Sequence, residues 1–192
     1  MARGGASPGL VLGLLGAGAL LILAAGSPPG RQLGGIVQGQ LGRFFSWAEL
    51  TRSRAASRLG LDNTPPPEAQ AAMRRLVEVV LDPLRTALGR PVRVTSGFRT
   101  AAVNEAVNGS TTSQHMRGEA VDIVVDGVSA EALAAFIVRL GVPFDQVIWY
   151  DAGRGGHVHV SYTERRRNRG QMLHAPEGGG FRVWSPAGSR LA

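Results

Sequence analysis

The chain of 192 residues contains neither cysteine nor lysine. The absence of cysteine excludes disulfide bonds and thiolate zinc sites, so only His, Asp and Glu side chains remain as strong ligands for a metal such as zinc. Because lysine is absent, all 21 basic residues are arginine, and the formal net charge is +7. Such a charge favours anionic partners, and nucleic acid, anionic lipid and cell-wall polymers all remain open on this ground alone.

Aromatic residues are also scarce, at 6% of the chain. Binding of nucleic acid requires a basic face with interleaved aromatic side chains, or a known binding module. The arginines are scattered instead, apart from the run "RRRNR" at 165–169. We therefore expect no nucleic-acid partner.

The amino-terminal segment is apolar. Arg3 lies in a short polar start, residues 10–25 carry no charge, and "SPPG" follows as a break. This run is shorter than the roughly 20 residues that span a bilayer, so a cleaved signal peptide and a retained membrane anchor both remain open. A buried core helix is disfavoured because the glycines in the run would destabilise it. We expect residues 1–26 to direct the protein to the membrane and into the periplasm or cell envelope.

The remaining chain is long enough for one globular domain. We predict a linker at 27–43, a folded domain at 44–170 and a tail at 171–192. Apolar residues at steps of three and four between 65 and 89 predict a buried helix, which Pro83 kinks or restarts. Further helices are predicted at "TAAVNEAV" and "SAEALAAFIVRLG", and strands at "PVRVTSG", "AVDIVV", "DQVIWY" and "HVHVSY". This order predicts an α+β fold with helices packed on one side of a small, mostly antiparallel sheet.

Two of the predicted strands carry polar side chains suited to a metal. In "HVHVSY", His157 and His159 point to the same face because side chains alternate along a strand. In "AVDIVV", Asp122 projects from the face opposite its apolar neighbours, and a buried carboxylate needs a partner. If the two strands share a sheet, His115 from the preceding loop can complete a cluster of two histidines and a carboxylate. Such a cluster suits zinc with an open fourth position.

Together these motifs resemble a known family. The stretch "SQHMRGEAVD" at 113–122, followed by His159 in "VHVS", is similar to the zinc D-alanyl-D-alanine peptidases of the M15 family. The upstream stretches "FSWAELTRS", "GLDNTP", "VLDPLR" and "VTSGFRT" resemble its phage and bacterial cell-wall-peptidase branch, so the likeness covers roughly 44–170. It implies the α+β fold of the D-Ala-D-Ala peptidases and hedgehog domains.

The resemblance also implies residue roles. It makes His115, Asp122 and His159 the ligands of one zinc ion, and it places Ser113 and Arg99 near the substrate's carboxylate or the reacting carbonyl. Arginine suits that place because its planar fork of donors pairs with a carboxylate or a developing oxyanion.

The general base is less clearly defined. Zinc would lower the pKa of its bound water, and a base would take the proton as the peptide carbonyl is attacked. Several relatives carry a glutamate three residues before the last histidine ligand, where this chain has Gly156; others carry a histidine two residues before it, as His157 does. Asp151 is the reserve candidate, and an exchange of roles between His157 and His159 also remains open. Glu119 is expected to face the solvent.

The function implied is a zinc metallopeptidase that cuts peptidoglycan stem peptides, as a D-Ala-D-Ala carboxypeptidase or as an endopeptidase within the stem. The alternative is a noncatalytic, zinc-stabilised module of the same fold that binds or assembles the cell wall. We expect a monomer that meets the stem peptide as substrate and the membrane through its amino-terminal segment.

Overall fold

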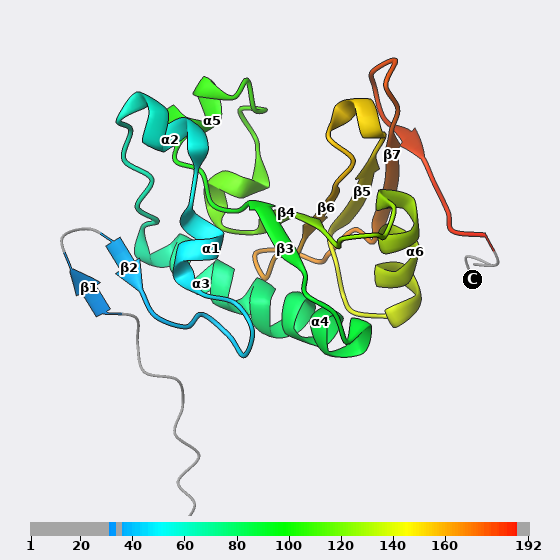
Figure 1. Cartoon of the computed structure of the whole chain (residues 1–192), viewed down its shortest axis with the longest axis horizontal. Helices are drawn as coiled ribbons and strands as arrows, with labels where there is room; N and C mark the ends of the chain where they lie inside the picture. Colours follow the sequence, from blue (N-terminus) through cyan, green and yellow to red (C-terminus); the bar gives the residue numbers. More distant parts are fainter. Residues whose placement is uncertain (1–30, 34–35, 188–192) are drawn as a thin grey trace, which may run out of the picture.

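The computed structural model describes residues 31–33 and 36–187. A six-stranded sheet and a set of helices form the body of the molecule, and a two-stranded sheet lies at its amino-terminal end (Figure 1). In chain order the elements are β1 (Arg31–Leu33), β2 (Ile36–Gln38), α1 (Trp47–Thr51), α2 (Arg54–Leu59), α3 (Pro67–Leu76), the π-helix η1 (Val77–Leu81), α4 (Asp82–Leu88), β3 (Arg93–Ser96), α5 (Ala101–Ala106), the 3-10 helix η2 (Gln114–Arg117), β4 (Ala120–Val124), α6 (Ala130–Leu140), β5 (Gln146–Tyr150), the 3-10 helix η3 (Ala152–Arg154), β6 (Val158–Ser161), β7 (Gln171–Ala175) and β8 (Arg182–Val183).

The six-stranded sheet has the strand order β3-β4-β6-β5-β7-β8. Four of its pairings are antiparallel, and only β5 and β7 run parallel. Strands β4, β5 and β6 occupy the middle, where both neighbours of each strand are paired. The predicted α+β fold with a mostly antiparallel sheet is therefore confirmed.

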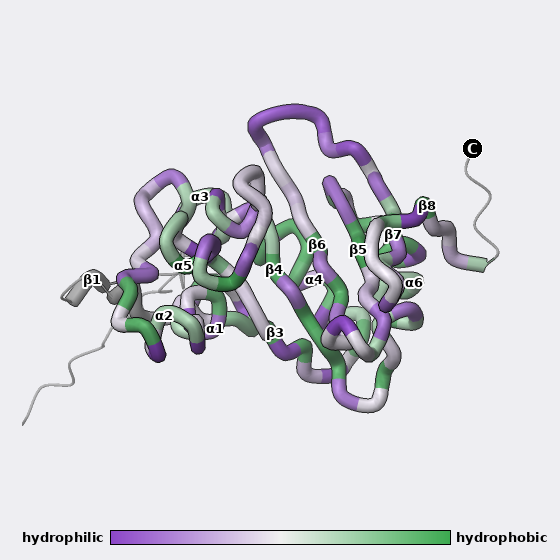
Figure 2. The backbone as a smooth tube through the Cα atoms, turned by 90° about the horizontal axis from the view of Figure 1, so that it is seen from above, coloured by the Kyte–Doolittle hydropathy of each residue, from purple (hydrophilic) through white to green (hydrophobic). Residues whose placement is uncertain are grey.

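One face of the central strands is apolar and packs against helices. Val121, Val160 and Val147 are register neighbours on β4, β6 and β5, and all three are fully or almost fully buried. They belong to one core cluster with buried residues of α3, η1, α4 and α6. Hydrophobic colouring follows these strands through the centre of the molecule in Figure 2. The side chains between these valines point to the other face, which is where the polar residues lie.

The long predicted helix changes its hydrogen-bonding pattern near Pro83. Residues 77–81 form a turn of π-helix between α3 and α4, and the backbone N–H of Asp82 donates to the carbonyl of Val77, five residues earlier. Proline has no N–H to donate, so a helix must adjust its hydrogen bonding around it. The helix therefore continues through this region with widened spacing.

The structure describes part of the predicted linker but not the predicted membrane segment. Residues 1–26 lie outside the described residues. Within 27–43, the described part contains the antiparallel strand pair β1–β2, Leu41 is buried, and the N–H of Arg43 donates to Asp82 Oδ2 at 2.7 Å. Packing on the core thus begins a few residues before position 44. In the part of the chain that the structure describes, no helix is long and apolar enough to cross a membrane.

The segment predicted as a tail takes part in the sheet. Strand β7 pairs with β5 along its whole length, and β8 pairs with β7. Leu173 and Ala175 of β7 bury their side chains against Ile148 of β5. The domain therefore extends past residue 170, because β5 would otherwise expose an unpaired edge.

Candidate metal centre

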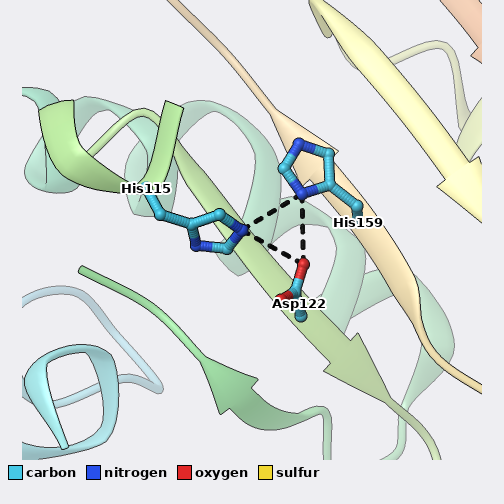
Figure 3. Close-up of side chains that lie close together, drawn as sticks. All are labelled: His115, Asp122 and His159. Carbon is cyan, nitrogen blue, oxygen red and sulfur yellow. Dashed lines mark hydrogen bonds and ion pairs between the residues drawn. The ribbon is translucent and has the colours of Figure 1, made fainter. Parts of the chain in front are cut away.

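Three side chains from three elements converge on the face of the sheet that the core helices leave uncovered (Figure 3). Asp122 lies in β4, and His159 lies directly opposite it in β6. His115 comes from η2, the helical turn that leads into β4. All three are buried, and each offers one donor atom to a group that could hold a metal ion. These are the three residues predicted as ligands.

The three donor atoms form a nearly equilateral triangle. His115 Nε2 lies 3.2 Å from His159 Nδ1 and 3.2 Å from Asp122 Oδ1. His159 Nδ1 lies 3.1 Å from Asp122 Oδ1. Ligand atoms placed about 2.0 to 2.1 Å from a tetrahedral zinc are separated from one another by about 3.3 to 3.4 Å. The triangle therefore fits one face of a zinc tetrahedron and leaves the fourth corner for a non-protein ligand.

Neighbouring groups orient two of the three side chains. The carbonyl oxygen of Gly97 lies 2.8 Å from His115 Nδ1, which fits an N–H at Nδ1 and directs the lone pair of Nε2 at the cluster. Arg99 Nη2 donates to the second carboxylate oxygen of Asp122 at 3.0 Å, and Arg99 Nε donates to Ser96 Oγ at 2.9 Å. Outer partners of this kind are the usual support of a metal site.

The electrostatics favour the protonation states that bind metal. Burial alone would raise the pKa of Asp122, but His115 and His159 hold that pKa well below its usual range. Burial also lowers the pKa of His159, which disfavours its charged form. A charged carboxylate and a neutral imidazole are the forms that coordinate zinc.

Two glycines allow the backbone around His115 to pack closely against α3 and α1. Gly118 ends η2 with a φ of 71°, and a Cβ at this position would collide with the carbonyl oxygen of Ala69. A Cβ on Gly97 would collide with the carbonyl oxygen of Leu50. Larger residues at either position would displace the turn that carries His115 or the carbonyl that orients it.

Glu119 corrects one expectation, because it does not face the solvent. Its side chain is only 2% exposed. It accepts hydrogen bonds from Thr163 Oγ1 at 2.6 Å, Arg165 Nε at 2.6 Å and Arg117 Nε at 2.9 Å. Burial alone would raise the pKa of Glu119, yet these donors lower it. The carboxylate is charged and joins the turn after η2 to the loop after β6.

The cluster lies in the wall of a cleft of about 760 Å³. Arg99, Ser113 and His157, the other residues predicted for the site, line the same cleft. The structure therefore brings all six predicted site residues together. Their separate roles remain predictions.

His157 lies beside the cluster, immediately before β6. Its ring stacks on Tyr150, with the centroids 4.3 Å apart, and burial lowers its pKa below the usual value. A neutral imidazole is able to accept a proton near neutral pH. The preceding Gly156 has a φ of 53°. A glutamate in this backbone conformation would be strained.

Asp151, the reserve candidate for the base, is held away from the cleft. Its Oδ1 lies 2.8 Å from His174 Nε2, and its Oδ2 accepts from the N–H of Glu177 at 3.0 Å. It does not line the cleft that contains the three candidate ligands. These contacts give Asp151 a structural role, in which it ties the loop before His157 to β7.

Sequence reasoning missed several residues of the cleft. Gln114, Tyr150, Arg166, Arg169 and Phe181 also line it. The arginines were visible as part of a basic run, but a charge run is usually a solvated surface. Nothing in the local pattern marks Tyr150 or Phe181, because their place depends on how β5 and the chain after β7 fold beside β6.

Comparison with known proteins agrees with the geometry of the cluster. The family model described as Peptidase M15 matches residues 43–161, which include the three candidate ligands. A search of curated proteins found no match.

Proposed function

The chain belongs to the M15 peptidase family, and from this premise we propose that it is a zinc-dependent peptidase that hydrolyses the stem peptides of peptidoglycan. The bond cut is the terminal D-Ala-D-Ala bond or a bond within the stem. The observation that carries the proposal is the triangle formed by His115, Asp122 and His159, whose dimensions suit zinc and which borders an open cleft.

Bound zinc would supply a water of lowered pKa and would polarise the peptide carbonyl. The chain's own residues do the rest. His157, neutral and within the cleft, accepts the proton at a ring nitrogen and returns it to the leaving amine. Arg99 pairs its remaining donors with the developing oxyanion or with a substrate carboxylate, and the hydroxyl of Ser113 offers a further hydrogen bond.

The test is incubation of the purified full-length chain with peptidoglycan, with and without a chelator, followed by identification of the new chain ends. We expect new termini that disappear with chelator and return with added zinc. The Asp122→Ala variant is the matched control, because it removes one candidate ligand and leaves the cleft in place. The new termini also identify the bond.

One observation favours a second candidate function. The glutamate that acts in several relatives is replaced by Gly156, as expected of a noncatalytic, zinc-stabilised module that binds or assembles the cell wall. Such a module would sediment with peptidoglycan and retain zinc, but it would release no new termini. The same incubation therefore separates the two candidates.

The amino-terminal segment supports a proposal about location. Residues 1–26 would direct the chain to the membrane, and the catalytic domain would reach peptidoglycan in the periplasm or cell envelope. Fractionation of cells that express the full-length chain tests this. Recovery of the protein entirely in the cytoplasmic fraction would contradict it.

A further inference from the structure

A second charged cluster lies in the same cleft, around Asp145. This residue, just before β5, is fully buried. Arg166 donates to its two oxygens at 2.6 and 2.9 Å, Arg169 Nη2 donates at 2.6 Å, and Gln114 Nε2 donates at 3.0 Å. One arginine would neutralise one carboxylate. Here two arginines pair with the single carboxylate of Asp145, so the cluster keeps a net positive charge.

The surplus charge faces the cleft. Arg166 and Arg169 both line it, and their side chains are 42% and 45% exposed. Each guanidinium uses one edge to hold Asp145. Among the described residues, Arg166 Nε and Arg169 Nη1 donate to no other group, so both arginines retain donors for an anion.

Gln114 helps to hold Asp145 in place beside the two arginines. Its side chain is buried at 7% exposure and lines the cleft, yet its Oε1 accepts no hydrogen bond from any described residue. The amide orientation is fixed by Asp145, which needs the Nε2 donor. This oxygen is itself buried, so Gln114 contributes to the cluster through the Nε2 donor that holds Asp145.

The position of the cluster defines where an anion bound by the two arginines would lie. Gln146, next to Asp145, pairs with Ser161 in β6, two residues along the strand from His159. Two residues of strand span about 6.6 to 7 Å. His157 precedes β6, two residues before His159, so it lies toward the other end of this strand from Ser161. The metal cluster therefore occupies the middle of the cleft, with the arginines toward one end.

We propose that Arg166 and Arg169 form a subsite for a carboxylate of the peptide substrate, separate from the group that Arg99 meets. This inference rests on the proposed function. An extended peptide advances about 3.3 to 3.6 Å per residue, so the carboxylate belongs to a residue about two positions from the scissile bond or nearer to it.

The test uses three peptides with the zinc-loaded full-length chain. The first is a stem pentapeptide with diaminopimelate at its third position. In the second peptide, the free carboxylate of the glutamate is converted to a carboxamide. In the third, the free side-chain carboxylate of the diaminopimelate is converted instead. The value of kcat/KM is measured where the chain hydrolyses a peptide, and the Kd is measured by calorimetry where it does not.

We expect one of the two amidations to lower kcat/KM, or to raise Kd, by about tenfold or more, because a charge-assisted hydrogen bond is lost. In Arg166→Gln this discrimination should collapse, and in Arg166→Lys part of it should persist. Arg167→Gln is the matched control: it removes one charge from the same run, but its exposed side chain does not line the cleft, so the discrimination should persist in full.

Equal values for all three peptides, or discrimination that survives in Arg166→Gln, would overturn the subsite. If Arg166→Gln fails to fold, the wild type and Arg166→Lys still decide the question. Hydrolysis without discrimination leaves the proposed function standing and refutes the subsite. Discrimination in Kd without any hydrolysis supports the subsite and refutes the peptidase.

Discussion

Arg99 contacts the candidate ligand Asp122 and also lines the cleft. Its replacement by lysine tests its role toward the metal and its role toward the substrate at once. The guanidinium donates to Asp122 and to Ser96, and the side chains of Arg99 and Asp122 are only 16% and 12% exposed. Lysine keeps the positive charge but has a single ammonium group, which cannot hold the carboxylate and reach a substrate oxygen in the same geometry.

Two separate losses follow from Arg99→Lys. Asp122 loses an oriented partner, so the affinity for zinc should fall by about 10- to 100-fold, as is usual when an outer partner of a metal ligand is removed. The transition state loses a charge-assisted hydrogen bond worth about 1.5 to 3 kcal/mol, so turnover at saturating zinc should fall by about tenfold or more.

The assay separates the two losses. Zinc affinity is measured by competition with a chromophoric chelator, and kcat is measured on a stem peptide at saturating zinc. Arg93→Lys is the control, because Arg93 lies on the neighbouring strand β3 with its side chain 61% exposed and pairs only with Asp126 among the described residues. Wild-type turnover at saturating zinc would remove Arg99 from the reaction, and wild-type zinc affinity would refute its role behind Asp122.

Three further predictions concern the clusters of the cleft. His115→Ala and Asp122→Ala should each abolish most zinc binding, and full occupancy of either variant by elemental analysis would contradict the ligand assignment. His157→Ala should retain zinc and lose about a hundredfold to ten-thousandfold in kcat, whereas His159→Ala should lose both; the reverse pattern would exchange the two roles. The surrounding arginines hold the pKa of Asp145 below its usual range, although burial alone would raise it, so its charge stabilises the fold above about pH 4 and this contribution is lost at lower pH. Asp145→Asn should therefore cost about 1 to 3 kcal/mol at pH 7, with a difference from the wild type that shrinks below pH 4; a constant difference in thermal unfolding from pH 7 to pH 3 would refute this.

Strand alternation constrains two of the three predicted ligands, which lie in β4 and β6. A carboxylate at Asp122 and an imidazole at His159 each had to leave the face occupied by their apolar neighbours. Alternation does not set the register between two strands, however. That Asp122 lies opposite His159 follows from the pairing of β4 with β6 and could be expected only from the resemblance to a known family.

Residues whose partners lie far along the chain were the ones that could not be placed. Glu119 is buried because Thr163 and Arg165, more than 40 residues away, donate to it. Asp151 is held by His174 on β7, a strand in the segment predicted as a tail. A carboxylate in a polar stretch is solvent-facing by default, and only the fold shows that donors converge on it.

The basic run at 165–169 shows how such long-range contacts build a site. As a pattern it is a hydrophilic loop, and it is coloured so in the arc between β6 and β7 (Figure 2). In the fold, Arg165 pairs with Glu119, whereas Arg166 and Arg169 turn to Asp145 and the cleft. The family match ends at residue 161, with the metal cluster inside it and these arginines beyond it. The three candidate ligands therefore belong to the matched region, and we expect the choice among peptides to depend on residues that follow it.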